Sequence, residues 1–338
     1  MNMYDTVTLL GIISQLIKFD PFLLNLFFPN VVEFNTREIA LDKVGKNLKL
    51  APFVSPMVAG KARTGEGYKT TAFAPAYLKP KGVVDPNRVL RRVAGEQMGG
   101  ALSNEARRDM IVADLLMEND MLIDHRLEWM AAQALLTGKV VVEGDDYPSQ
   151  EVDFGRTAGL TKALSGGARW GQSGVKPLDD IETWAGQAES PISDIVMDSK
   201  AWALFRKSDD VKDSLDTRRG SRTELETGPD NGRNFSYKGR LGADMDLWVY
   251  NGVYVDDQGA TKKYLPDFSV VMGSPAIEGH RAFGAILSPS AGYQAMERFP
   301  RHFISQDPEV EYVETQSAPL IIPGRPDASV AINVDTGS

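Results

Sequence analysis

The chain has 338 residues, of which 42% are hydrophobic and 25% are charged, the composition of an ordinary globular protein with room for two or three modules. It contains no cysteine, which excludes disulfide bonds, thiolate zinc sites and cysteine nucleophiles. The net charge of −9 is uneven, because residues 1–92 carry +6 and residues 93–338 therefore carry −15.

Residues 1–48 are predicted to form an N-terminal arm. A short helical piece is expected around Thr6–Lys18, and a dense apolar cluster follows over Phe22–Phe28. Such a cluster beside a proline usually docks on the chain's own core or on a neighbour. The apolar run Val7–Phe28 is interrupted by charged residues and a proline and lacks a basic leader, so we expect neither a membrane span nor a secretory signal.

Residues 49–88 are predicted to form a long hairpin. Strand-like segments at Phe53–Ala59 and Tyr68–Tyr77 flank a glycine-rich tip, Lys61–Gly67. Between Lys43 and Arg92 there are eleven Lys or Arg residues and only two acidic ones. Because an isolated hairpin is marginally stable in water, this basic hairpin needs support from another surface.

Residues 103–137 are predicted to form one long helix. Ser103 or Asn104 is an N-cap residue, Gly138 is a typical C-terminal cap, and no Pro or Gly interrupts the segment. A helix of this length is about 52 Å long, about the width of a compact globule of this size. A chain built around such a rod is expected to be a flat or extended plate.

The remaining sequence alternates short strands with helices, so the predicted fold class is α+β. Helices are expected at Asp180–Gly186 and, capped by Asp198, at Ser199–Leu215. Strands are expected at Val140–Glu143, Glu151–Phe154, Ile192–Met197, Met245–Tyr250, Val253–Asp256, Lys262–Leu265, Phe268–Met272, Val310–Ile322 and Ala328–Val334.

No pattern predicts catalysis or cofactor binding. Gly60 and Gly65 have the spacing of a phosphate-binding loop, but Glu66 stands where such a loop needs lysine. The three histidines are far apart, and the acidic doublets lie at turns and helix starts. The basic hairpin lacks the interleaved aromatic residues of a nucleic-acid binder. We therefore assign no catalytic residue, cofactor or metal site.

A series of short segments resembles the lambda-type major capsid protein family of tailed bacteriophages. The segments fall in family order along almost the whole chain, and the ordered series carries the resemblance. They include Phe19–Pro21, Val54–Pro56, Leu90–Arg92, Val152–Arg156, Trp202–Arg206, Leu215–Ser221, Ser236–Gly239 and Gln316–Leu320.

The resemblance implies the Hong Kong 97-type phage capsid fold. Its parts would be the N-terminal arm (1–48), the extended E-loop hairpin (49–88), a peripheral domain (89–156) with the spine helix at 103–137, an axial domain (157–299) and a return to the peripheral domain (300–338). It also implies a structural protein that is not an enzyme. Such a major head protein self-assembles in the host cytoplasm into hexamers and pentamers, which form the icosahedral virion shell around packaged double-stranded DNA.

The expected partners are other copies of the chain, a decoration protein, a scaffolding protein and a portal, with DNA enclosed but not tightly bound. Inter-subunit contacts are predicted at Phe22, Phe27 and Phe28 of the arm, and at Lys61, Arg63 and Lys69, which would face carboxylates of a neighbouring copy. A strand of the decoration protein is expected to pair with the hairpin edge. The residues of that edge are Phe53, Val54, Val58, Tyr68, Phe73 and Tyr77.

Two alternatives stay open. A nanocompartment shell shares the fold but encloses protein cargo. A soluble α+β enzyme would instead be a monomer with a deep polar pocket.

Overall fold

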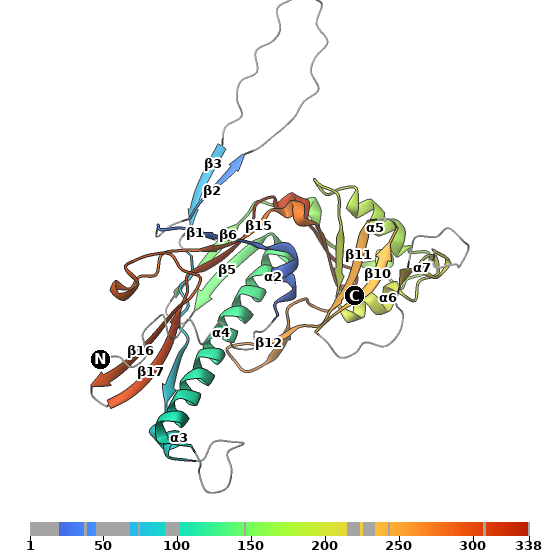
Figure 1. The fold of residues 1–338 in the computed structure, drawn as a ribbon. Coiled ribbons are helices and arrows are strands. Elements are labelled where there is room, and N and C mark those ends of the chain that lie inside the picture. The colour runs from blue at the N-terminus through green and yellow to red at the C-terminus, as the bar shows by residue number, and fades with distance from the viewer. Residues whose placement is uncertain are drawn as a thin grey trace, which may run out of the picture.

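The protein is described by a computed structural model. It describes residues 20–36, 39–44, 68–73, 75–91, 102–144, 147–214, 224–225, 234–242, 244–306 and 309–336. The architecture is mixed α and β, with one long helix on one side and a large sheet on the other (Figure 1).

Helix α4 (Asn104–Thr137) is the longest element and confirms the predicted helix. The Ser103 hydroxyl oxygen accepts a hydrogen bond from the Ala106 amide at 3.1 Å, which satisfies one of the free amides of the first turn. Gly138 ends the helix with φ at 71°, and a Cβ there would lie 2.8 Å from the Cβ of Arg156. Glycine is therefore required at this cap both by conformation and by space.

An antiparallel sheet covers the N-terminal half of α4. It joins β16 (Phe299–Gln306), β17 (Glu309–Gln316) and β4 (Lys81–Val84), and the short helix α3 (Pro86–Leu90) follows β4. The small core between sheet and helix consists of buried aliphatic side chains: Val84, Ile111, Val112, Leu115, Leu116 and Val313. The hairpin of β5 (Lys139–Gly144) and β6 (Tyr147–Asp153) follows α4 directly.

The C-terminal half of α4 packs on the main core. Here α2 (Phe22–Phe27) lies against α4, beside a sheet in which β15 (Gly279–Phe283) pairs in parallel with β1 (Asn30–Glu33) and antiparallel with β18 (Pro319–Pro323). The first segment of the described chain thus builds the centre of the molecule.

A seven-stranded mixed sheet forms the other side of the molecule (Figure 1). Its order is β7 (Thr161–Ala163), β19 (Val330–Asn333), β14 (Ser269–Gly273), β8 (Asp194–Met197), β11 (Met245–Tyr250), β10 (Phe235–Leu241) and β9 (Glu224–Leu225). Helices α5 (Pro177–Ala185), α6 (Ser199–Phe205) and α7 (Asp209–Ser214) belong to this part, and β12 (Val253–Val255) with β13 (Thr261–Lys263) forms a separate hairpin. Short 3-10 turns occur at Ala158–Leu160, Gly166–Ala168, Pro275–Ile277, Pro289–Ala291 and Pro326–Ala328.

Two predicted elements are divided in the structure. The helix expected at Ser199–Leu215 is α6 followed by α7, because Asp210 sits in the first turn of the second helix and accepts the Leu178 amide at 2.9 Å. The strand expected at Val310–Ile322 is β17 followed by β18, because Ser317 leaves the ladder to pair with Leu78. The capping role of Asp198 is confirmed, since its carboxylate accepts the amides of Lys200 and Ala201.

The predicted domain limits also differ from the sheet pairing. β4 falls in the range assigned to the hairpin but pairs with β17, and β19 falls in the predicted return segment 300–338 but pairs with β14 in the seven-stranded sheet. Sequence order does not reveal this, because strands from distant segments pair. Among the described residues, no helix has the length and apolar character that a membrane crossing requires.

Candidate assembly surfaces

A two-stranded hairpin projects from the body of the molecule (Figure 1). β2 (Ile39–Val44) pairs antiparallel with β3 (Tyr68–Phe73), with Ile39 opposite Phe73 and Val44 opposite Tyr68. In the described part of the chain, neither strand pairs with a third strand. The described partner of residues 68–73 is therefore 39–44, within the segment assigned to the arm. The predicted strand Phe53–Ala59 lies outside the described residues.

The predicted hairpin residues fall into three groups. Lys61, Arg63, Phe53, Val54 and Val58 lie outside the described residues. Tyr68 and Lys69 lie in β3, where Lys69 is opposite Lys43. At the base of the hairpin, Phe73 is half-buried against the main core.

Tyr77 lies beyond β3 and is fixed to the body of the molecule. Its hydroxyl donates to the Gln316 side-chain oxygen at 2.7 Å and accepts the Leu287 amide at 3.0 Å. Burial is the main cause that raises the pKa of Tyr77. Tyr77 therefore anchors the chain that leaves the hairpin. The prediction that it belongs to a strand ending at Tyr77 is wrong, because β3 ends at Phe73.

The three arm phenylalanines are core residues of their own chain. Phe22 is 7%, Phe27 1% and Phe28 0% exposed, and the Phe22 ring stacks on Phe235 with centroids 4.6 Å apart. The prediction that they contact neighbouring subunits is therefore wrong. An apolar cluster indicates burial, but it does not indicate which surface buries it.

Helix α2 is held at both ends by charged side chains that sequence analysis missed. The Glu128 carboxylate accepts the amides of Leu23 and Leu24, each at 2.9 Å, and the Tyr250 hydroxyl at 2.7 Å. Burial raises the pKa of Glu128, and these hydrogen bonds oppose the effect. At the other end of α2, Arg281 donates to the Phe28 carbonyl at 2.6 Å and the Leu24 carbonyl at 3.2 Å. Only the apolar neighbours of Glu128 in sequence could have indicated its burial.

A second arginine, Arg156, caps the C-terminal end of α4 and connects this helix to the seven-stranded sheet. Arg156 donates to the Leu135 and Leu136 carbonyls at 2.5 and 2.7 Å and to the Thr161 hydroxyl at 2.8 Å. Burial lowers its pKa to about 10, so the guanidinium stays charged at neutral pH, where it complements the carbonyl end of the helix. Arg156 is the last residue of the segment Val152–Arg156, which is one of the segments that resemble the capsid family.

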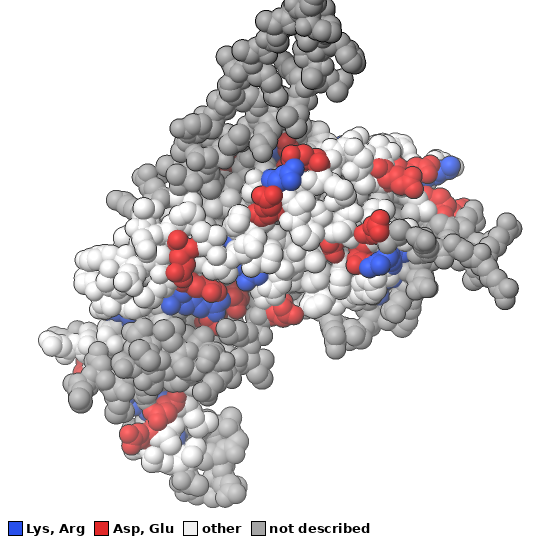
Figure 2. All heavy atoms as spheres, turned by 45° about the horizontal axis from the view of Figure 1, so that its top comes forward, with Lys and Arg blue, Asp and Glu red and all other residues white. Residues whose placement is uncertain are grey.

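The acidic residues of α4 divide into a buried and an exposed set. Asp120 and Asp124 are buried and form ion pairs with Arg298, and Glu128 is bound to α2. The carboxylates that remain exposed on α4 are Glu105, Asp109, Asp114 and Glu118. On the face drawn in Figure 2, acidic side chains cover more of the described surface than basic ones. Among the carboxylates of α4, this exposed set is the one that a basic segment of another copy could reach.

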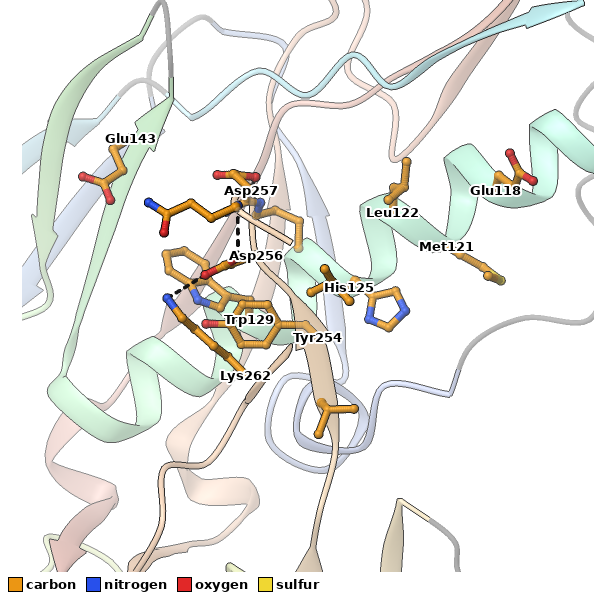
Figure 3. A pocket seen from close by; sticks show the side chains of 14 residues that line it. Glu118, Met121, Leu122, His125, Trp129, Glu143, Tyr254, Asp256, Asp257 and Lys262 are labelled. Carbon is orange, nitrogen blue, oxygen red and sulfur yellow. Dashed lines mark hydrogen bonds and ion pairs between the residues drawn. The ribbon is translucent and has the colours of Figure 1, made fainter. Parts of the chain in front are cut away.

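The described residues contain no cluster of three or more His, Asp or Glu side chains placed to hold a metal ion. A groove of about 770 Å³ lies between α4 and the β12–β13 hairpin (Figure 3). Its histidine, His125, has its ring nitrogen Nδ1 2.5 Å from the Tyr264 hydroxyl, and burial lowers the pKa of this histidine. Its lysine, Lys262, is paired with Asp256 at 2.8 Å. His125 and Lys262 are thus each bonded to a neighbouring side chain of the same chain.

Comparisons with known proteins agree over the full length of the chain. The model of the family described as phage major capsid protein E matches residues 5–334. The major capsid proteins of Escherichia phage N15 and Escherichia phage lambda are each 37% identical to this chain over 342 residues, which cover 99% of this chain and 100% of each relative.

Solved structures agree with the sequence relatives. A capsid protein of a prophage of E. coli CFT073 has a TM-score of 0.77 at 26% identity, covering 98% of this chain and 99% of that one. The capsid of a native GTA particle has a TM-score of 0.53 at 12% identity, covering 95% and 93%, and so shares the fold. The chain belongs to the phage major capsid protein E family.

Proposed function

We propose that the chain self-assembles into hexamers and pentamers that close into the icosahedral head shell of a tailed phage around its double-stranded DNA. The observation that carries this proposal is the likeness to phage major capsid proteins, which extends over 99% of the chain. The role is structural and requires no cofactor.

The isolated β2–β3 hairpin supports an assembling role. A two-stranded sheet that projects from its own body has little stability in water. A neighbouring subunit would cover its faces, and obligate interfaces of this kind bury about 2,000 Å² or more. In this scheme the predicted E-loop is the hairpin that starts at β2.

The charge distribution suggests what the hairpin meets. Lys61, Arg63 and Lys69 belong to the basic segment between Lys43 and Arg92. Their partners in a neighbouring copy are carboxylates of the exposed set on α4, among them Asp114 and Glu118. Each exposed pair contributes only about 0.2–1 kcal/mol, but a shell repeats each contact in every subunit.

The hairpin edge is also the proposed site for a decoration protein. A terminal segment of that protein would add a strand beside Phe53, Val54, Val58, Tyr68 and Phe73 by main-chain hydrogen bonds. The described part of the chain supports this proposal, since β2 and β3 pair with no third strand there. A map of the decorated shell with the partner bound far from residues 39–73 would contradict it.

The remaining partners are a scaffolding protein and a portal, which a closed shell with one DNA entry needs. DNA is enclosed without tight binding, because residues 93–338 carry −15. Tight phosphate binding would also oppose the sliding of DNA during packaging.

Negative-stain images of the purified, concentrated protein test the proposal. Closed shells of uniform size are expected, whereas a protein that stays monomeric at high concentration would contradict it. The contents of particles isolated from the host distinguish the nanocompartment alternative, because a phage head holds DNA and a nanocompartment holds protein cargo.

A further inference from the structure

The connection between β15 and β16 forms a closed loop that exposes two large, mainly apolar side chains. Leu287 is 56% and Tyr293 is 58% exposed. The backbone of the loop is bonded to itself, since the Ile286 amide donates to the Gln294 carbonyl at 3.0 Å. The Tyr293 amide also donates to the Ser288 carbonyl at 3.4 Å. Apolar side chains on an ordered loop suit a contact with another protein surface, because binding then costs little conformational entropy.

The fold holds this loop in place at the cost of a strained backbone. Tyr293 has φ at 58°, a left-handed conformation that a residue other than glycine keeps only where the surrounding structure fixes it. The Tyr77 hydroxyl accepts the Leu287 amide at 3.0 Å, and the Asn35 side-chain oxygen accepts the Ala295 amide at 2.9 Å. The Tyr293 ring is therefore presented to water in one position, although its own chain leaves it exposed.

The groove between α4 and the β12–β13 hairpin is a concave apolar surface that water reaches. Its volume is about 770 Å³, and Leu122, 59% exposed, and Val255, 67% exposed, are among its lining residues. Figure 3 shows Trp129 of α4 near Tyr254 of β12, and Leu122 farther along the helix. A contiguous exposed apolar surface of this kind usually marks an interaction site.

We propose that the loop of residues 286–295 of one copy lies in this groove of the next copy around a ring. In the proposed hexamers and pentamers, on which this inference rests, every contact is head to tail. Each subunit must therefore present two different surfaces that fit each other. A convex loop and a concave groove, both apolar, meet this requirement. In Figure 1 the loop curls out beyond β15 at the left of the molecule, whereas β12 lies on the other side of α4, so one subunit can use both surfaces at once.

The charges beside the two surfaces are opposite in sign. Residues 286–295 carry no charge, but the exposed Lys79 has its ammonium group 4.8 Å from the centre of the Tyr77 ring, whose hydroxyl bonds to the loop at Leu287. The rim of the groove has more acidic than basic side chains: Glu118, Glu143, Asp256 and Asp257 against Arg126 and Lys262. A loop that enters the groove with Lys79 at its rim thus brings unlike charges together, which favours this orientation of the two copies.

Paired cysteines test this contact, because the chain has no cysteine of its own. Shells of the double variant Tyr293→Cys with Leu122→Cys are oxidised mildly and run on a denaturing gel. A head-to-tail contact links each chain to two neighbours, so the gel should show a ladder that reaches five or six chains. Each single variant should run as one chain. The matched control, Tyr293→Cys with Met110→Cys, uses a residue of the same helix outside the groove, 42% exposed, and should give several-fold less linked product.

Intact shells without linked chains, products that stop at two chains, or equal yields in the control would overturn this contact and leave the proposed function standing. A wild-type protein that forms no shells would instead contradict the function. If the double variant does not assemble, Leu122→Cys subunits assembled with an excess of wild-type subunits decide the question. Their thiol should react with a maleimide several-fold more slowly in the shell than in the free subunit, and an equal rate would overturn the contact.

Discussion

At the scale of single residues, Glu128 joins the first part of the chain to the long helix. A buried carboxylate is costly unless hydrogen-bond donors surround it. Glu128 has three such donors, the amides of Leu23 and Leu24 and the hydroxyl of Tyr250. Its side chain thus specifies where α2 docks on α4, which the apolar residues of α2 alone do not.

The variant Glu128→Gln should lower the free energy of unfolding of the subunit by about 1–3 kcal/mol. The amide group keeps the shape of the carboxylate but turns an NH₂ group towards donors, so at least one buried donor loses its acceptor. Urea denaturation of the unassembled subunit measures the change. Glu118→Gln, at an exposed position of the same helix, should change it by no more than about 0.5 kcal/mol. Equal effects of the two variants would show that the buried carboxylate does not stabilise the fold.

At the scale of elements, the sequence predicted best what local signals determine. The ends of α4 follow from Ser103 and Gly138, and the start of α6 follows from the capping carboxylate of Asp198. The partner of β3 could not be predicted, because pairing with residues 39–44 depends on a contact across a long loop. The break between α6 and α7 was missed for a related reason, since Asp210 is bonded to the distant Leu178.

A substitution at one exposed position tests whether α4 is a continuous helix. Asp114→Pro removes a backbone hydrogen bond and brings the proline ring against the preceding turn, at a cost of about 3 kcal/mol or more. Circular dichroism and urea denaturation should show the loss. Asp114→Ala keeps the backbone and should be close to wild type. A proline variant with wild-type stability would mean that the helix is already broken there.

The basic hairpin is expected to act in assembly and not in folding. The triple variant Lys61→Glu, Arg63→Glu and Lys69→Glu should leave the subunit folded but slow or abolish shell formation, followed by light scattering. Wild-type assembly should also weaken towards 1 M salt, where the screening length falls to about 3 Å. A control with the same change in net charge, Lys176→Glu, Arg206→Glu and Lys207→Glu, reverses exposed residues of the part built on the seven-stranded sheet. If both triple variants assemble alike, the hairpin charge has no specific partner.

At the scale of the whole molecule, the ordered series of family-like segments predicted the family better than any feature predicted contacts between copies. The family model that matches residues 5–334 confirms the resemblance. The sequence of one chain does not indicate directly which of its residues contact another copy. Phe22, Phe27 and Phe28 show this, because an apolar side chain is buried equally well by its own chain or by a neighbour.

Unassembled subunits should bind duplex DNA weakly at physiological salt. The −15 charge of residues 93–338 repels phosphates, and the basic segment is the part proposed to pair with carboxylates. Fluorescence anisotropy with a labelled duplex measures the affinity. Submicromolar binding with a steep salt dependence would instead show a phosphate-binding surface.

The β2–β3 hairpin is expected to be unstable in a single subunit, and hydrogen exchange measures its stability. Amides of residues 39–44 and 68–73 should exchange rapidly in the free subunit and become protected in the assembled shell. The β16–β17 sheet, which packs on α4 within the chain, should be protected in both states. Equal protection of the hairpin in the free subunit and in the shell would contradict the claim that neighbouring copies complete this fold.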